Sequence, residues 1–312
     1  MNRRNFDAAI AQFNAASKDG LQMKSVIISD PRGYLKKDFI EHPTPTDLRS
    51  ISKLVVSLAL GVAIESGVQL RGEPLSLDTR IAPFFADFVV SKAGDEKKFA
   101  EEIRLRHLIT NTIGHRNGFL FRADVGGRDP NSLLDYIFAQ PLEYPPGTHF
   151  SYSNVGWYLL SAIVRDELGV PLSQWVEGML LRRLGILNFD WVKYGLYEAG
   201  ATGLSMANED LHKIGQLLLQ GGRFGEERIV PESWIKAACS PVIAASSGYD
   251  PSSPLQASGY GYGIWVCEDG TLYCDGSGGQ FLIVIPAKSR VITALTESGD
   301  TLRVSTCLRP VL

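Results

Sequence analysis

Hydrophobic positions divide this chain into a helical middle and strand-like ends. Apolar residues from Leu54 to Ala63 recur every three or four positions, the spacing of a helix face, and Gly67 follows as a stop signal. Near both ends the pattern changes to short apolar runs punctuated by Gly, Pro and Asp. The sequence therefore predicts an α+β fold, with one antiparallel sheet built from both chain ends and a helical lobe inserted between them.

The individual elements follow from the same periodicities. The expected helices are 1–20, Ile51–Ser66, Leu105–Thr110, Leu133–Phe138, Trp157–Glu167, Leu172–Leu184, Asn208–Gln220 and Pro231–Cys239. The expected strands are Leu21–Ile28, Tyr34–Phe39, Tyr262–Val266, Thr271–Cys274, Phe281–Ile285 and Val291–Thr296, with turns at Asp30–Gly33 and Asp269–Gly270. We expect one domain over residues 1–312, with a sheet lobe at about 21–45 and 255–312 and a helical lobe at about 46–254. A site is expected in the crevice between the lobes.

Composition narrows the classes of function. The 312 residues are 45% hydrophobic and 21% charged, with a net charge of −3, so neither a nucleic acid nor another polyanion is an expected partner. No run of about 18 apolar residues predicts a membrane span, and no secretory signal precedes the first helix, so we expect a cytoplasmic protein. The four cysteines lack C-x-x-C spacing and are expected to be unpaired thiols. No metal-binding motif or cofactor is indicated, and the oligomeric state is open.

Ser50 and Lys53 are the first candidates for chemistry. They stand three residues apart at the start of the predicted helix, so both project from nearly the same face. A hydroxyl beside an amine suggests a nucleophile and its base. The alternative is a helix-capping serine with a solvated lysine. The same spacing recurs at Ser233 and Lys236, which we interpret as part of an ordinary amphipathic helix.

Two further segments supply polar groups. Tyr152 and Asn154 follow a Pro-Pro-Gly turn and precede a helix. A tyrosine near a lysine can have a lowered pKa and relay protons, and an asparagine can bind a polar substrate; the alternative is a packing tyrosine and a capping amide. Gly276, Ser277 and Gly278 precede a strand, where backbone N–H groups could approach a ligand, unless they merely form a bulge.

Taken together, these segments resemble the serine β-lactamase and penicillin-binding-protein superfamily, in particular the class C-related branch that includes esterases, D-aminopeptidases and 6-aminohexanoate-oligomer hydrolases. The resemblance extends in family order from about Ser25 to Thr296 and implies the β-lactamase-like α+β fold. The matching segments are Ser50–Lys53, Ile103–Gly114, Pro146–Asn154, Ala201–Met206, Asp210–Gly222 and Tyr260–Trp265.

The resemblance implies roles for these residues. Ser50 is the expected nucleophile, with Lys53 and Tyr152 as alternative bases and proton carriers. The N–H groups of Ser50 and Ser277 are the expected oxyanion hole. Asn154, Gly276 and Gly278 are expected to contact a small ester or amide substrate.

The chain departs from the family pattern at two positions. Asn111 stands where histidine is common, a position that is usually structural. The third motif of the family begins with Lys or His, whereas this chain has Cys274-Asp275-Gly276. The missing cation argues against a substrate carboxylate and favours an esterase or amidase.

Other functions remain as alternatives. A β-lactamase or D-amino-acid peptidase is one, and a non-catalytic binding or scaffold protein of the same fold is another. A Ser-His-Asp hydrolase is disfavoured because no G-x-S-x-G motif occurs and the histidines, 42, 107, 115, 149 and 212, are scattered.

Overall fold

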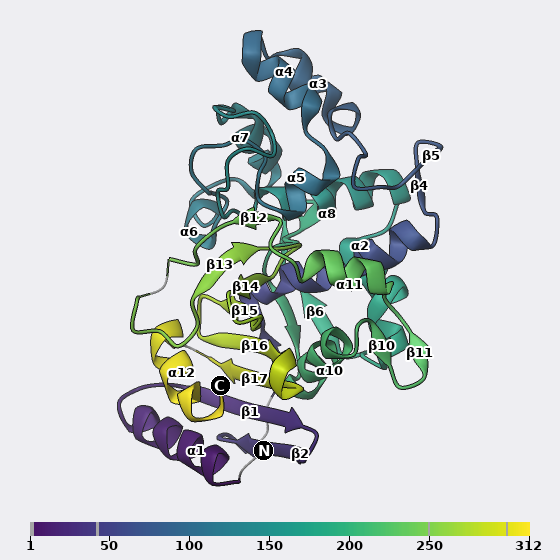
Figure 1. Ribbon diagram of the computed structural model, residues 1–312. Coiled ribbons are helices and arrows are strands. Elements are labelled where there is room, and N and C mark those ends of the chain that lie inside the picture. The colour runs from purple at the N-terminus through teal and green to yellow at the C-terminus, as the bar shows by residue number, and fades with distance from the viewer. Residues whose placement is uncertain (1–2, 42–43, 249, 298) are drawn as a thin grey trace.

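The computed structural model describes residues 3–41, 44–248, 250–297 and 299–312. Its largest feature is an eight-stranded antiparallel sheet in the order β12-β13-β14-β15-β16-β17-β1-β2 (Figure 1). The strands are β1 (Met23–Asp30), β2 (Gly33–Asp38), β12 (Ile243–Ala244), β13 (Ala257–Tyr260), β14 (Trp265–Cys267), β15 (Leu272–Gly276), β16 (Gln280–Ile285) and β17 (Arg290–Thr296). Because β1 pairs with β17, the prediction of a sheet built from both chain ends is confirmed.

Between β2 and β12, helices alternate with loops and short strands, which agrees with the predicted helical lobe and its long loops. The helices are α1 (Arg3–Lys18), α2 (Ser52–Glu65), α3 (Ala86–Val90), α4 (Gly94–Glu102), α5 (Leu105–Ile109), α6 (Arg122–Val125), α7 (Leu133–Ala139), α8 (Val155–Leu168), α9 (Leu172–Val176), α10 (Asn208–Leu219), α11 (Glu232–Ala238) and α12 (Thr301–Leu308). The 3-10 turns are η1 (Arg49–Ile51), η2 (Ala82–Phe85), η3 (Pro130–Ser132), η5 (Arg182–Leu184), η6 (Pro286–Lys288) and η7 (Arg309–Val311), and η4 (Glu177–Leu181) is a π-helical turn.

The two predicted turns of the sheet are present. In the β1–β2 hairpin, Asp30 lies opposite Gly33, and the Arg32 N–H donates to Asp30 Oδ1 at 2.9 Å. Between β14 and β15, Gly270 has a φ of +80° and its N–H donates to the Cys267 carbonyl at 3.1 Å. A glycine accepts this backbone conformation without the steric cost that other residues incur.

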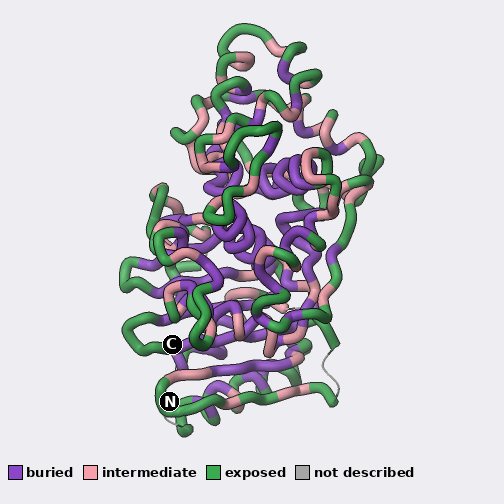
Figure 2. The backbone as a smooth tube through the Cα atoms, turned by 90° about the vertical axis from the view of Figure 1, so that its right-hand side faces the viewer, coloured by how far each residue is buried: buried purple, intermediate pink, exposed green. Residues whose placement is uncertain are grey.

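The two faces of the sheet are covered by different helices. Along β17, Val291 and Leu295 pack in the cluster that contains α10 and α2, whereas Ile292 and Ala294 pack with α1 and α12. This alternation is the period of two expected for a strand that is buried on both faces. Figure 2 shows the resulting buried segments in the middle of the molecule and exposed ones around it.

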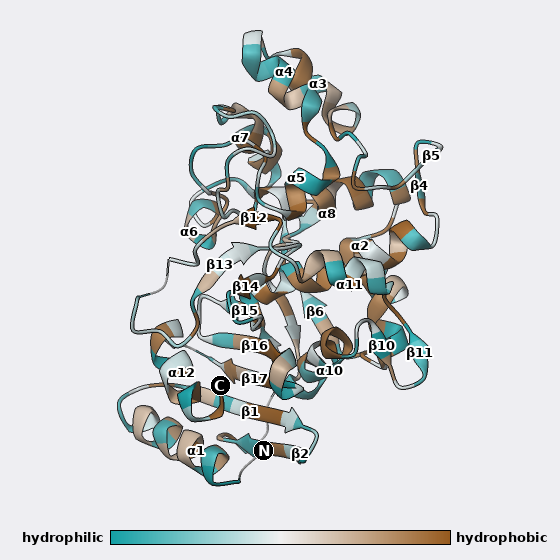
Figure 3. Cartoon of the chain, in the orientation of Figure 1, coloured by the Kyte–Doolittle hydropathy of each residue, from teal (hydrophilic) through white to brown (hydrophobic). Residues whose placement is uncertain are grey.

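Helix α2 is the buried central helix of the helical lobe. Its residues from Ser52 to Ala63 are all buried, and it packs against α9, α11 and η4. It ends where the sequence predicts, since Gly67 has a φ of +69° and its N–H donates to Ile64 O at 3.1 Å. Hydropathy differs between the elements: much of β1 is hydrophobic, whereas the hairpin of β10 (Arg223–Phe224) and β11 (Glu227–Arg228) is mostly hydrophilic (Figure 3).

Several elements differ from the prediction. The predicted helix Leu172–Leu184 is divided into α9, η4 and η5. A small sheet of β3 (Thr46–Asp47), β9 (Leu204–Met206) and β6 (Phe189–Trp191) was not predicted, nor were β13 and α12. The remaining short hairpins are β4 (Gln69–Leu70) with β5 (Glu73–Pro74) and β7 (Lys193–Tyr194) with β8 (Tyr197–Glu198).

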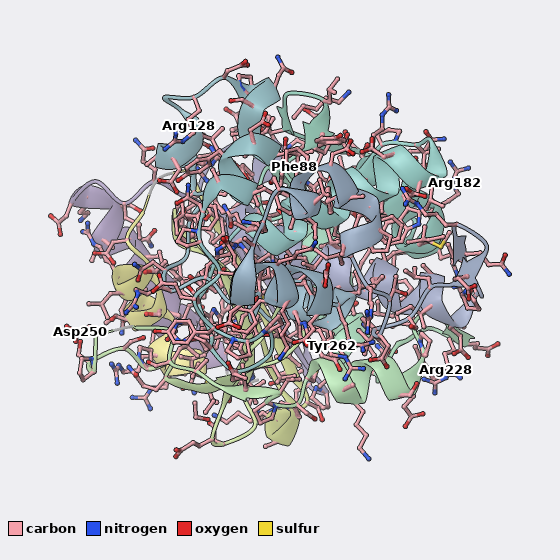
Figure 4. The ribbon with its side chains drawn as sticks, turned by 90° about the horizontal axis from the view of Figure 1, so that it is seen from above. Phe88, Arg128, Arg182, Arg228, Asp250 and Tyr262 are labelled. Atoms are coloured by element: carbon pink, nitrogen blue, oxygen red, sulfur yellow. The ribbon has the colours of Figure 1, made fainter. Side chains whose placement is uncertain are left out.

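Charged side chains are distributed over the outside of the molecule. Viewed from above, Arg128, Arg182 and Arg228 lie at separate places on the periphery (Figure 4). Within the ranges described above, no helix combines the length and apolar character needed to cross a membrane.

Candidate active site

Ser50 lies in the 3-10 turn η1, immediately before α2. The preceding residue, Arg49, has a φ of +54°, a conformation that costs energy for a non-glycine residue. Two hydrogen bonds hold this turn: the Arg49 N–H donates to Asp47 Oδ1 at 2.8 Å, and Ser52 Oγ donates to the Arg49 carbonyl at 2.6 Å. The N-cap residue of α2 is Ile51, so Ser50 does not cap this helix.

Lys53 is fully buried, with 0% of its surface exposed. Its Nζ lies 3.0 Å from Ser50 Oγ, 2.8 Å from Asn154 Oδ1 and 3.2 Å from the carbonyl oxygen of Ala201. Burial lowers the pKa of Lys53 to about 7, although the negative charge of Asp275 partly opposes this shift. A lysine in this state exchanges a proton near neutral pH, which is what a general base requires.

Tyr152 lies next to both residues. Lys53 Nζ is 4.8 Å from the centre of the Tyr152 ring, and the tyrosine side chain forms a hydrogen bond with Ser50. Burial, with the charge of Asp275, raises the pKa of Tyr152 well above its usual value, although the Ser50 hydrogen bond acts in the other direction. The expectation of a lowered Tyr152 pKa is therefore wrong, because burial is the largest influence on this phenol and favours its protonated form.

Aromatic side chains from the sheet fix the Tyr152 ring. Trp265 stacks on it, with ring centres 5.3 Å apart and planes 22° apart, and Tyr260 contacts it edge-on at 5.9 Å. Asn111 supports the same loop, since its carbonyl accepts the Ser151 N–H at 2.9 Å. The sequence motif around Tyr260 and Trp265 was recognised, but this contact was not predicted.

Asn154 lies between Lys53 and the neighbouring loop. Its Oδ1 accepts from Lys53, and its Nδ2 donates to the Leu120 carbonyl at 3.0 Å. These contacts orient the lysine. Each amide atom can form a second hydrogen bond, and Asn154 lines the cavity described below, so a contact with substrate stays a prediction.

The glycine-rich turn between β15 and β16 lies against the Ser50 segment. A Cβ on Gly276 would come within 2.8 Å of Arg49 Cβ and 2.9 Å of the Leu48 carbonyl oxygen, so glycine permits this close approach. The Gly278 N–H donates to Gln280 Oε1 at 3.1 Å, and its carbonyl accepts from Thr296 Oγ1. Both glycines thus shape the turn that carries Ser277, and their contact with substrate stays a prediction.

A cavity of about 430 Å³ brings most of the predicted residues together. Its lining residues are Ser50, Phe121, Arg122, Ala123, Tyr152, Asn154, Thr202, Ser246, Ser247, Trp265, Asp275 and Ser277. Ser50 and Ser277, the two expected oxyanion donors, therefore line the same cavity. Thr202, Ser246 and Ser247 reach this cavity from loops far apart in the chain, and no sequence motif identifies these three side chains as site residues.

Other candidates lie elsewhere. Ser233 and Lys236 are exposed on α11, as expected for an amphipathic helix. His212 is buried between Ser29 and Thr293, and His107 accepts the Arg104 N–H at 3.1 Å. His42 lies outside the described residues. The four cysteines are free thiols, as predicted.

The described residues show no metal centre. Among them, no group of three or more His, Cys, Asp or Glu side chains is arranged to hold a metal ion. The arrangement of Ser50, Lys53 and Tyr152 can transfer protons and form a covalent bond from its own side chains.

Solved structures of other proteins share the fold of this chain. Among solved structures, the octameric penicillin-binding protein homologue from Pyrococcus abyssi superposes with a TM-score of 0.74 at 21% identity, covering 100% of this chain and 77% of the other. EstCE1, a hydrolase with promiscuous acyltransferase activity, superposes with a TM-score of 0.73 at 17% identity, covering 98% of each chain. At these identities the likeness shows the fold.

Sequence relatives cover less of the chain. A protein of Escherichia coli (strain K12) named "Putative D-alanyl-D-alanine carboxypeptidase" is 33% identical over 118 residues, which are 35% of this chain and 26% of the relative. A protein of the same name from Salmonella schwarzengrund is 26% identical over 183 residues, 52% of this chain and 39% of the relative. The chain thus matches less than half the length of these curated relatives.

The family model for Beta-lactamase matches residues 41–305, which include Ser50, Lys53, Tyr152 and the glycine-rich turn. The beta-lactamase fold predicted from the sequence motifs is thereby confirmed. The chain belongs to the Beta-lactamase family of hydrolases.

Proposed function

We propose that this protein is a serine hydrolase that cleaves small esters or amides through an acyl-enzyme on Ser50. The observation that carries the proposal is the hydrogen bonding of Lys53. Asn154 Oδ1 and the Ala201 carbonyl oxygen can only accept hydrogen bonds. When the Lys53 amine is neutral, its two N–H groups donate to these two oxygens. The lone pair of that amine is then left for the Ser50 hydroxyl, 3.0 Å away.

The proposed reaction begins with proton transfer. Lys53 takes the Ser50 proton as Oγ attacks the substrate carbonyl, and the N–H groups of Ser50 and Ser277 stabilise the oxyanion. Removing one such donor typically costs about 3 kcal/mol of transition-state stabilisation. The proton passes to the leaving alcohol or amine, aided by Tyr152, and the acyl group stays on Ser50.

Water completes the cycle. A water molecule gives a proton to Lys53 as its oxygen attacks the acyl-enzyme carbonyl. Collapse of this second intermediate returns the proton to Ser50 Oγ and releases the acid. The raised pKa of Tyr152 supports a role for its hydroxyl as a hydrogen-bond donor, and the lowered pKa of Lys53 supports the lysine as the base.

Covalent labelling tests the proposal. Wild type is expected to react with a fluorophosphonate probe and to hydrolyse p-nitrophenyl butyrate, and Ser50→Ala is expected to do neither. Ser233→Ala is the matched control, because it removes a serine of the same spacing from the exposed face of α11. If Ser50→Ala matches wild type in both assays, the protein is a non-catalytic member of the fold.

A D-amino-acid peptidase or β-lactamase is the second candidate, supported by the names of the curated relatives. Cys274 stands where the family pattern has a cation, and this missing cation, with the carboxylate of Asp275 adjacent, argues against it. Nitrocefin and a D-alanyl-D-alanine peptide are the discriminating substrates: turnover of either at a rate above that of simple esters would favour this second candidate.

A further inference from the structure

Two polar side chains hold Arg49, the residue immediately before Ser50. Asp47 Oδ1 accepts the Arg49 N–H at 2.8 Å, and Ser52 Oγ donates to the Arg49 carbonyl at 2.6 Å. Arg49 has a φ of +54°, a conformation that a non-glycine residue keeps only when its surroundings enforce it. These two contacts therefore determine how the peptide that leads into Ser50 is oriented.

Both side chains are anchored on the small three-stranded sheet. Asp47 in β3 lies opposite Ser205 of β9, and the Leu48 N–H donates to the Leu204 carbonyl at 2.8 Å. Ser52 Oγ accepts the Leu204 N–H at 3.3 Å. Strand β9 thus fixes the positions of both groups that hold the η1 turn.

The second oxygen of the Asp47 carboxylate contacts the wall of the cavity. Asp47 Oδ2 forms an ion pair with the Arg122 guanidinium of α6, and residues 121–123 line the cavity. Arg49 Nε also lies 3.4 Å from this oxygen. The Arg122 side chain is 43% exposed, and ion pairs of this kind contribute little to overall stability. The effect of this contact is local: one carboxylate joins the η1 turn to the α6 wall of the cavity.

We propose that Asp47 is a positioning residue for the reaction at Ser50: one oxygen fixes the turn that presents the nucleophile, and the other fixes the α6 wall against which substrate binds. The inference rests on the proposed function, because it explains how that same site is held in its reactive arrangement. A misplacement of about 1 Å at a reacting group can lower a rate by about a hundredfold, so loss of the first contact acts on kcat. Loss of the second contact displaces the wall and acts on KM.

Substitutions at Asp47 and Arg122 separate the two contacts. Asp47→Asn keeps an oxygen for the Arg49 N–H but removes the charge that pairs with Arg122. Arg122→Gln removes the ion pair alone, and Asp47→Ala removes both contacts. With p-nitrophenyl butyrate, Asp47→Ala is expected to lower kcat by about tenfold to a hundredfold.

The two milder variants are expected to act on KM. Asp47→Asn and Arg122→Gln should each keep kcat within about twofold of wild type and raise KM by about threefold, the scale of a partly exposed ion pair. The double variant should raise KM no further, because both changes remove the same interaction.

Two measurements separate these effects from a loss of folded protein. Fluorophosphonate labelling run to completion counts the reactive sites, and kcat is expressed per reactive site, so an unfolded fraction does not alter it. Asp190→Ala is the matched control. Asp190 of β6 lies opposite Ser205 on the other side of β9, is exposed, and does not line the cavity. Its kcat and KM should equal those of wild type.

The outcomes distinguish this inference from the proposed function. If Ser50→Ala is inactive while Asp47→Ala keeps the wild-type kcat, or if Asp47→Asn loses as much kcat as Asp47→Ala, the inference is wrong and the hydrolase proposal stands. An unchanged KM in Arg122→Gln, or a KM in the double variant above that of either single variant, also overturns the inference. If Ser50→Ala hydrolyses the ester as fast as wild type, the proposed function itself fails.

The test does not depend on the folding of Asp47→Ala. If that variant yields no folded protein, Asp47→Asn and Arg122→Gln decide the question. A kcat near that of wild type with an equally raised KM in both supports the inference, and any other result contradicts it.

Discussion

Lys53 is the residue on which the proposed chemistry depends. Its amine is the group that accepts the Ser50 proton, so Lys53→Ala is expected to lower kcat for a p-nitrophenyl ester by at least about a hundredfold, the scale of general-base catalysis. Lys236→Ala, which alters the lysine of the second Ser-x-x-Lys segment on the exposed face of α11, should leave kcat unchanged. Near-normal turnover by Lys53→Ala would indicate that Tyr152, and not Lys53, is the base.

The ionisation of Lys53 predicts a pH dependence. Below its pKa the ammonium has no lone pair, so kcat/KM for a neutral ester is expected to rise with pH through about 7 and then level off. A profile that stays flat between pH 5 and 9 would show that Lys53 is not the base.

Asp275 is expected to influence the pH at which kcat/KM rises. Its negative charge stabilises the Lys53 ammonium and thereby raises the lysine pKa. Asp275→Asn removes that charge, so the acidic limb of kcat/KM for the neutral ester should move to lower pH. A limb that moves to higher pH in this variant, or does not move, would contradict the electrostatic coupling of the two residues.

Sequence reasoning located most of the site residues, because their spacing is local. Ser50 and Lys53 are one helical turn apart, and Tyr152 and Asn154 share one loop. The network between these segments was not predictable, since the contact of Lys53 with Asn154 joins residues 101 positions apart. The direction of the Tyr152 pKa was predicted wrongly for the same reason: burial is a property of the assembled site.

At the scale of elements, the position of Tyr152 depends on how closely α8 packs on α5. A Cβ on Gly156, in the first turn of α8, would lie 2.2 Å from the Leu108 carbonyl oxygen of α5. Gly156→Ala is therefore expected to lower the free energy of unfolding by about 1–3 kcal/mol, measured by urea denaturation. Gly178→Ala is the control, because a Cβ there meets nothing within 4 Å, and that variant should match or exceed wild type.

The elements predicted correctly are those with a strong local pattern. Long segments with a helical apolar pattern, such as α1, α8 and α10, and the regular strands β16 and β17 lie close to their predicted ranges. Strand β13 was not predicted because glycine and serine interrupt its apolar pattern. Strands β3, β6 and β9 were not predicted because they are only two or three residues long. Such short strands exist through pairing with distant segments, which no local periodicity encodes.

At the scale of the whole molecule, α1 closes the face of the sheet that lies away from the helical lobe. Phe13 anchors it, with 0% of its surface exposed and its ring 5.9 Å from that of Phe39. Phe13→Ala is expected to lower the free energy of unfolding by about 3–5 kcal/mol. Gln12→Ala, at the exposed neighbouring position, should change it by less than about 0.5 kcal/mol, and equal losses in the two variants would mean that α1 does not seal the sheet.

The pairing of β1 with β17 has a consequence for how the chain is made in the cell. Met23 of β1 lies opposite Thr296 of β17, so the ribosome must add more than 250 residues before β1 can acquire this neighbour. At a synthesis rate of about 5–20 residues per second, the β1–β2 hairpin, in which β1 is the apolar strand, waits for tens of seconds with one edge open. A nascent chain in this state is exposed to aggregation and is a substrate for holding chaperones. Premature termination anywhere before β17 would leave that edge permanently unpaired and direct the fragment to proteolysis.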